Sequence, residues 1–124
     1  MIHHYFSKVQ SKLEAIKWII IEQSVNFDLV SDEMGIVTGK LVFLDHSILD
    51  FMELISETEP EYRFQYMNKD KGLICRWDSA PHHKEVKTFP YHLHTKKGVE
   101  DSKTVNLIEI LDDVSGKVVE NLKL

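Results

Sequence analysis

Two stretches in the middle of the chain alternate apolar and polar residues with a period of two, the pattern of half-buried β-strands. They cover residues 62–66 and 73–77, and residues 68–72 between them (Asn-Lys-Asp-Lys-Gly) predict a hairpin loop. The apolar positions are Tyr62, Phe64, Tyr66, Leu73, Cys75 and Trp77. Because a hairpin determines which residues share a sheet face, this pattern constrains the fold more than any other feature of the sequence.

The polar residues of this hairpin form a second set on the opposite face of the sheet. With a four-residue loop, Gln65 would lie beside Arg76 and Arg63 beside Asp78, which pairs an arginine with a carboxylate across the strands. Two arginines on one rigid face can bind a phosphate through paired hydrogen bonds. The alternative is a solvated Arg63–Asp78 ion pair worth less than about 1 kcal/mol.

Apolar residues recur at three- and four-residue spacing at both ends of the chain, which predicts two amphipathic helices. In the second helix, Asn106 is expected to be the N-cap and Glu109 the reciprocal partner of a capping box. The first apolar stripe comprises Ile2, Tyr5, Phe6, Val9, Leu13 and Ile16, and the second comprises Leu107, Ile110, Leu111, Val114, Val118 and Leu122.

The segment between the two helices contains further strand patterns separated by short turns. Strands are expected around residues 25–29, 36–44 and 48–55, before the hairpin, and at about residues 91–95 after it. Residues 78–91 carry two prolines and no clear period, which indicates a structured loop. We therefore predict a single α+β domain over residues 1–124, an antiparallel meander of about five to six strands with both helices packed on one face.

Composition narrows the class of protein. The chain has 124 residues, 43% of them hydrophobic and 28% charged, which is typical of a folded domain. Cys75 is the only cysteine, so a disulfide or a cysteine-based zinc site within the chain is excluded; we expect it to be a buried thiol in a reducing compartment. The start resembles no signal peptide, and the longest apolar run, residues 18–21, is too short to cross a membrane, so a cytoplasmic protein is expected.

Charge is distributed unevenly along the chain. The formal net charge of −5 argues against a general nucleic-acid-binding protein. However, residues 63–97 hold eight basic and three acidic residues, a net of +5, which leaves −10 for the rest. The same segment contains four of the seven histidines. It could therefore present a positive face to an anionic ligand, or it could be an ordinary solvated surface.

Histidines in this basic segment are the candidate catalytic residues. His92 and His94 are two apart in an expected strand and should project together, with His82 or His83 nearby. One neutral and one protonated imidazole can act as general base and general acid on a phosphodiester, which needs no metal or other cofactor. Alternatively, two or three histidines could bind zinc or another divalent metal, or they could only hydrogen-bond to backbone and hold the shape of the loop.

These segments together resemble the TumE toxin family. The resemblance rests mainly on Arg-Trp-Asp-Ser-Ala-Pro-His-His at residues 76–83 and Phe-Pro-Tyr-His-Leu-His at residues 89–94. Tyr-Arg-Phe-Gln-Tyr at residues 62–66 and the helix from Asn106 add to it, although a serine often caps that helix in the family. Asn106 conserves the capping chemistry.

Membership of this family would imply the toxin of a toxin–antitoxin pair, in complex with a TumA-like antitoxin that resembles helix-turn-helix regulators. RNA is a candidate target, a homodimer is left open, and no membrane partner is expected. The candidate catalytic residues are His82, His83, His92 and His94, with Arg63 and Arg76 binding phosphate, Asp78 orienting them, and no metal ligand assigned. The leading hypothesis is a metal-independent ribonuclease. The alternatives are a non-enzymatic module that binds its antitoxin or an anionic partner, and a metal-dependent hydrolase.

Overall fold

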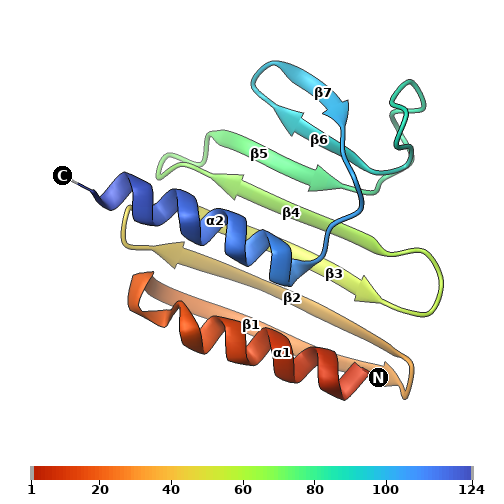
Figure 1. Cartoon of the computed structure of the whole chain (residues 1–124), viewed down its shortest axis with the longest axis horizontal. Helices are drawn as coiled ribbons and strands as arrows, with labels where there is room; N and C mark the ends of the chain where they lie inside the picture. Colours follow the sequence, from red (N-terminus) through yellow and green to blue (C-terminus); the bar gives the residue numbers. More distant parts are fainter. Residues whose placement is uncertain (1, 124) are drawn as a thin grey trace.

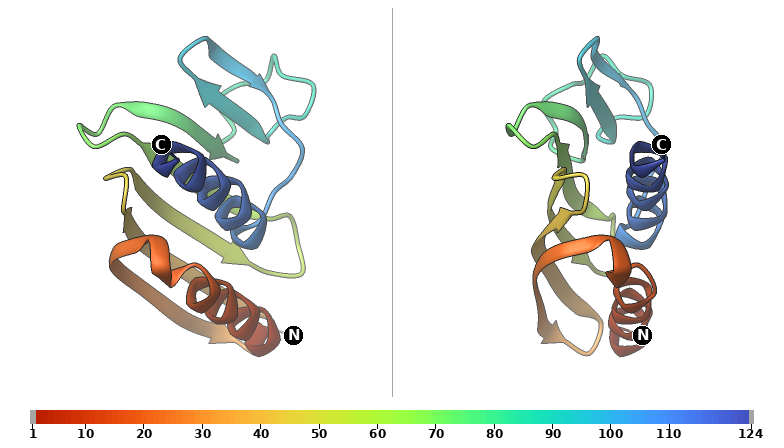
Figure 2. Two further views of the ribbon diagram at one scale, coloured as in Figure 1. Left: turned by 60° about the vertical axis from the view of Figure 1, so that its left-hand side comes forward. Right: turned by 90° about the vertical axis from the view of Figure 1, so that its left-hand side faces the viewer.

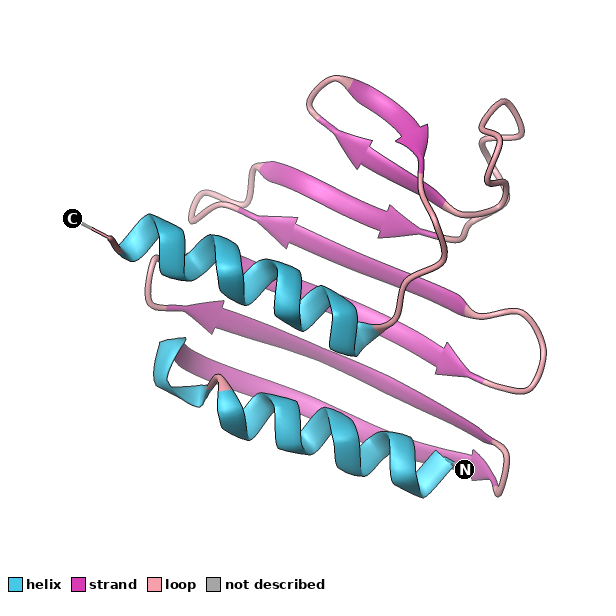
Figure 3. Ribbon diagram, in the orientation of Figure 1, coloured by secondary structure: helices cyan, strands magenta, loops and turns pink. Residues whose placement is uncertain are grey.

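The computed structural model describes residues 2–123 and contains a sheet with a helix at either end of the chain (Figures 1 and 3). The helical elements are α1 (Ile2–Ala15), the 3-10 turn η1 (Lys17–Ile19) and α2 (Leu107–Leu122). The strands are β1 (Ile20–Ser31), β2 (Met34–Phe43), β3 (Ile48–Ile55), β4 (Glu61–Met67), β5 (Leu73–Asp78), β6 (His92–Thr95) and β7 (Gly98–Asp101).

The strands lie in the sheet in the order in which they occur along the chain, and every neighbouring pair is antiparallel. This arrangement confirms the predicted meander. It follows from the short connections between most strands, which return the chain directly beside the strand it has just left.

Within residues 2–123 the sheet has seven strands, one more than the upper end of the predicted five to six. The strand that was missed is β7, which pairs with β6 through a tight turn where Thr95 lies opposite Gly98. Gly98 has a positive φ of 123°, a conformation that glycine adopts without steric cost. The sequence of β7 is weakly strand-like, because Val99 is its only apolar residue. Pairing with β6, rather than propensity, makes this segment a strand.

Both helices cover the same face of the sheet, as the end-on view of Figure 2 shows, and they contact each other. The predicted stripe of α1 is buried at Ile2, Phe6, Val9 and Leu13. In α2, the stripe is buried from Leu107 to Val118, but Leu122 at its end is exposed. The sheet contributes the aromatic residues of β4 together with Cys75 and Trp77 of β5, which confirms these members of the predicted inward-facing set. Leu73, the remaining member, is only partly buried and lies outside this core, next to a register shift between β4 and β5.

The predicted capping box begins α2. The Asn106 side chain accepts a hydrogen bond from the Glu109 backbone N–H at 2.9 Å, and Glu109 Oε1 accepts one from the Asn106 N–H at 3.1 Å. These two bonds satisfy donors that the first turn of a helix leaves without partners.

A buried carboxylate connects the two helices to the sheet. Glu53 of β3 is 4% exposed and accepts hydrogen bonds from Tyr5 Oη at 2.6 Å and from the Leu107 N–H at 3.2 Å. Burial raises the pKa of Glu53, and the two hydrogen bonds offset part of that effect. Glu53 borders a cavity, and two other titratable groups line it, the Tyr5 hydroxyl and the Glu109 carboxylate.

This raised pKa predicts a pH-dependent contribution to stability. The folded protein holds the Glu53 proton more tightly than the unfolded chain does. The contribution of Glu53 to the free energy of unfolding is therefore fully present below the pKa of a free glutamate, about 4.3. It is lost as pH rises through the pKa that Glu53 has in the folded protein. Relative to Glu53→Gln, the wild-type free energy of unfolding should decrease over that range in urea titrations at a series of pH values. A relative increase with pH would mean that the hydrogen bonds outweigh burial.

Candidate functional site

The sheet face opposite the helices carries the polar residues of β4, β5 and β6. Across β4 and β5, Arg63 lies opposite Asp78 and Gln65 opposite Arg76, which is the register predicted from the hairpin. Across β5 and β6, Arg76 lies opposite His94, and Asp78 lies opposite His92. Residues directly opposite each other in an antiparallel pair project to the same side, so arginine and imidazole groups share one face.

The predicted ion pair between Arg63 and Asp78 is not formed, although the two residues lie opposite each other. Asp78 pairs instead with Arg76 of its own strand, whose Nε lies 3.3 Å from Asp78 Oδ2. The other Asp78 oxygen accepts a hydrogen bond from the Ala80 N–H at 2.8 Å. Arg76 and Asp78 are two apart in a strand and project to the same side, so this contact competes directly with the cross-strand pair.

Gln65 joins the two arginines. Its Oε1 accepts hydrogen bonds from Arg63 Nη1 and Arg76 Nη1, each at 3.3 Å. Within residues 2–123, the Nε of Arg76 is the only buried side-chain nitrogen or oxygen without a hydrogen-bond partner, because its contact with Asp78 lacks hydrogen-bond geometry. A guanidinium group has five N–H donors, so Arg76 retains donors for an anionic ligand.

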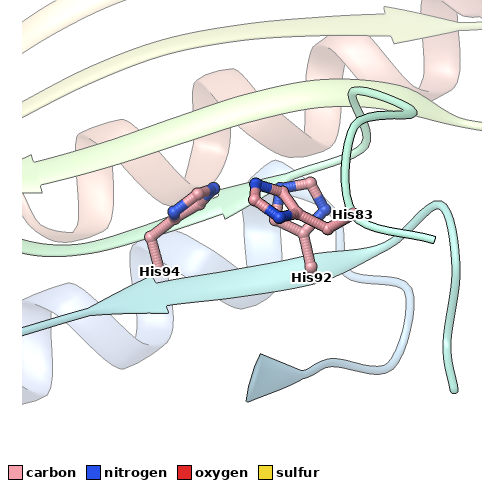
Figure 4. A group of neighbouring side chains, drawn as sticks. All are labelled: His83, His92 and His94. Atoms are coloured by element: carbon pink, nitrogen blue, oxygen red, sulfur yellow. The ribbon is translucent and has the colours of Figure 1, made fainter. Parts of the chain in front are cut away.

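Three histidine rings meet on this face between β6 and the loop of residues 79–91 (Figure 4). His92 and His94 project together from β6, as their spacing predicted, and His83 reaches them from the loop. The ring centroids are 4.8 Å apart for His83 and His92, 5.2 Å for His83 and His94, and 4.8 Å for His92 and His94. The rings meet edge to face at interplanar angles of 63° to 76°.

Two of the three rings are held by hydrogen bonds at Nδ1. His92 Nδ1 lies 2.8 Å from the Pro90 carbonyl oxygen, and His83 Nδ1 lies 3.0 Å from Glu85 Oε1. Both partners accept hydrogen bonds, so in each ring Nδ1 carries the proton and donates it. In the neutral ring, Nε2 then keeps its lone pair. The two rings differ in exposure, because His92 is 1% exposed whereas His83 is partly accessible.

The pKa values of nearby groups follow from this arrangement. The pKa of His94 is lowered, first by burial and then by the positive charge of Arg76. The pKa of Glu85 is lowered by a hydrogen bond from its own backbone N–H and by its contact with His83. On the other face of the sheet, burial raises the pKa of the Cys75 thiol, which fits the expected core residue rather than a nucleophile.

The structure does not bring all the predicted histidines together. His82 is exposed and lies outside the cluster, although it is adjacent to His83 in sequence. Conversely, sequence reasoning missed the Glu85 carboxylate and the Pro90 carbonyl, which orient His83 and His92. The position of Glu85, two residues after His83, was the only available signal for its role, and it is weak because loop conformation decides such contacts.

A hollow of about 380 Å³ adjoins the site on the side of Arg63. Its lining consists of Met52, Glu61, Tyr62, Arg63, Asp78, Ser79, Ala80 and Pro81. This volume lies within the range of small-molecule sites and can accept a nucleotide-sized group. The site can therefore bind an anion through its arginines, and its three imidazoles can exchange protons or bind a transition metal.

Fold and site together define a small α+β protein whose helices cover one sheet face and whose opposite face carries imidazole and guanidinium groups. The family model described as "Toxin TumE" matches residues 10–122, nearly the whole chain. The chain belongs to the TumE toxin family, which makes it a toxin of a toxin–antitoxin system and implies a cognate antitoxin. No curated protein and no solved structure matches this sequence. Between residues 2 and 123, neither helix has the length and apolar character needed to span a bilayer.

Proposed function

We propose that this TumE-family toxin cleaves RNA in the cytoplasm as a metal-independent ribonuclease. The observation that carries the proposal is the meeting of His83, His92 and His94 on the sheet face that also carries Arg76. Clustered imidazoles supply both a proton acceptor and a proton donor near neutral pH, and a neighbouring guanidinium can bind the phosphate on which they act.

The reaction requires two proton transfers. One imidazole accepts the proton of the ribose 2′-hydroxyl, whose oxygen attacks the adjacent phosphorus. A second, protonated imidazole donates its proton to the 5′-oxygen as the P–O5′ bond breaks. The products are a 2′,3′-cyclic phosphate and a free 5′-hydroxyl, and no oxidant, reductant or additional reactant is consumed. His94 and His83 are the more accessible partners for these transfers, because His92 is buried.

The remaining residues bind and position the substrate. Arg76 lies opposite His94, so its guanidinium can stabilise negative charge that develops on the phosphate oxygens. Arg63 borders the adjoining hollow and can hold a neighbouring phosphate of the chain. Asp78 positions Arg76 through their 3.3 Å ion pair. His82 lies outside the cluster and has no part in this mechanism.

The cognate antitoxin in this proposal is a TumA-like helix-turn-helix protein that forms a complex with the toxin. A non-enzymatic toxin that only binds its antitoxin or an anionic partner remains the competing account. It predicts that charge reversal at Arg63 and Arg76 weakens binding while purified protein leaves RNA intact.

Purified protein in a chelating buffer should cleave RNA, and Arg76→Gln should reduce the cleavage rate on the order of 100-fold. The loss is expected because one donor to the transition-state anion is removed from a partly buried site. Gel analysis of a labelled RNA, with detection of the 2′,3′-cyclic end, measures both effects. Lys97→Gln is the matched control, since it removes one positive charge at the exposed turn between β6 and β7.

Intact RNA after incubation with folded, toxic protein would overturn the ribonuclease proposal and favour the binding module. Equal losses in Arg76→Gln and Lys97→Gln would show that overall charge, not the guanidinium at this site, determines activity. Circular dichroism of both variants establishes that the fold is retained.

A further inference from the structure

The three histidines offer one ring nitrogen each, and these nitrogens lie within 4.8 Å of one another. Figure 4 shows the rings turned toward a common centre, two from β6 and one from the loop. β6 holds His92 and His94 at the spacing of alternate residues, and His83 comes from the loop of residues 79–91. A single ligand bound at this centre could therefore contact all three rings.

The hydrogen bonds at Nδ1 of His92 and His83 match those of metal-binding histidines. Such histidines commonly donate their second ring N–H to a carbonyl or a carboxylate, which fixes the tautomer and makes the other nitrogen a better donor to the metal. His92 has the Pro90 carbonyl in this role, and His83 has the Glu85 carboxylate. His94 makes no side-chain hydrogen bond within residues 2–123, so its ring can adjust without breaking one.

Charged groups around the centre include three carboxylates and one guanidinium. Asp78 and Asp101 lie on either side of His92 in the sheet, and Glu85 contacts His83. Arg76 lies opposite His94, but it is paired with Asp78. These carboxylates can offset the charge of a divalent cation bound by the imidazoles.

We propose that His83, His92 and His94 bind one divalent transition-metal ion of the zinc class. Three neutral imidazoles with no carboxylate or thiolate among the direct ligands suit zinc and its neighbours rather than magnesium or calcium. Zinc–nitrogen distances of about 2.0–2.1 Å place tetrahedral ligand atoms about 3.3 Å apart, so the rings must move closer together when the ion binds. A water molecule or a substrate oxygen would complete the coordination.

Binding of this ion would regulate RNA cleavage at the site. This part of the inference rests on the ribonuclease proposed above. A nitrogen lone pair that coordinates zinc cannot accept a proton, so the ion competes with acid–base catalysis at the same atoms. Zinc should therefore suppress RNA cleavage, and a chelator should restore it.

Direct binding is measured on the full chain without a histidine tag, after treatment with chelator, by titration calorimetry with ZnCl2 and by the visible absorption of Co²⁺. One ion per chain is expected. His94→Ala should weaken binding at least about 100-fold, and Glu85→Ala should weaken it about 10-fold by removing the hydrogen-bond partner of His83 Nδ1. His82→Ala is the matched control and should bind as the wild type does. Absence of binding, or equal binding by His94→Ala, overturns the metal site.

Cleavage assays with and without ZnCl2 separate this inference from the ribonuclease itself. If the wild-type protein binds zinc, cleaves RNA in chelator and loses this activity when zinc is added, the result supports both the metal site and the ribonuclease. Cleavage in chelator without zinc binding overturns the metal site and leaves the ribonuclease standing. Zinc binding by a protein that cleaves no RNA supports the site and overturns the ribonuclease. Cleavage that occurs only with zinc overturns the competitive role, since the ion then acts as a cofactor.

Discussion

His94→Ala is expected to abolish the growth inhibition that the wild-type toxin causes when it is produced without its antitoxin. The substitution removes a partly accessible imidazole from the cluster. It leaves the backbone pairing of β6 with β5 and with β7 unchanged. General acid–base catalysis by one positioned residue typically contributes 10²- to 10⁴-fold in rate, so the remaining activity should lie below the level that slows growth. Growth curves after induced expression, with soluble protein quantified, measure the effect.

His82→Ala is the matched control, because the same change is made in the same loop outside the cluster. It should remain fully toxic. Position 94 is preferred to position 92, because His92 is 1% exposed and its truncation would leave a cavity. A loss of activity in that variant could then result from lower stability of the fold. A soluble, folded His94→Ala protein that inhibits growth as strongly as the wild type would rule out the histidine site as the source of toxicity.

Leu111→Ala should lower the free energy of unfolding by about 2–5 kcal/mol, the range for truncating a buried leucine. Leu111 is fully buried on the face of α2 that packs against the sheet. The change removes apolar contacts and leaves a cavity between helix and sheet. Denaturant unfolding followed by circular dichroism gives the free energy.

Leu122→Ala makes the same chemical change near the end of the same helix, where the side chain is 36% exposed. Its effect should stay within about 0.5 kcal/mol. Equal losses for both variants would mean that α2 does not pack on the sheet through its predicted stripe. Such a result would contradict the arrangement of helices on which the open polar face depends.

A large part of the candidate site followed from the hairpin pattern. The alternation in residues 62–66 and 73–77 correctly placed Arg63, Gln65, Arg76 and Asp78 on one face and predicted their cross-strand neighbours. What it could not predict was the choice of ion pair, because Asp78 has an arginine available both across the sheet and along its own strand. That choice depends on side-chain conformations and on the Ala80 N–H, which takes the second carboxylate oxygen.

The histidine cluster was predicted only in part. Period-two geometry correctly paired His92 with His94, since residues two apart in a strand project to the same side. The same geometry could not show that His83, and not His82, joins the cluster. Both lie in residues 79–91, which have no repeating backbone geometry from which side-chain directions can be calculated.

Sequence alone determined the features that arise within a few residues: the two amphipathic helices, the capping box, and the register and faces of the central hairpin. In these, backbone geometry repeats, so spacing along the chain specifies direction in space. Tertiary structure alone decided the connection of both helices through Glu53 and the approach of His83 to β6. Those features join residues whose relative positions depend on the packing of the whole domain, and no local pattern encodes that packing.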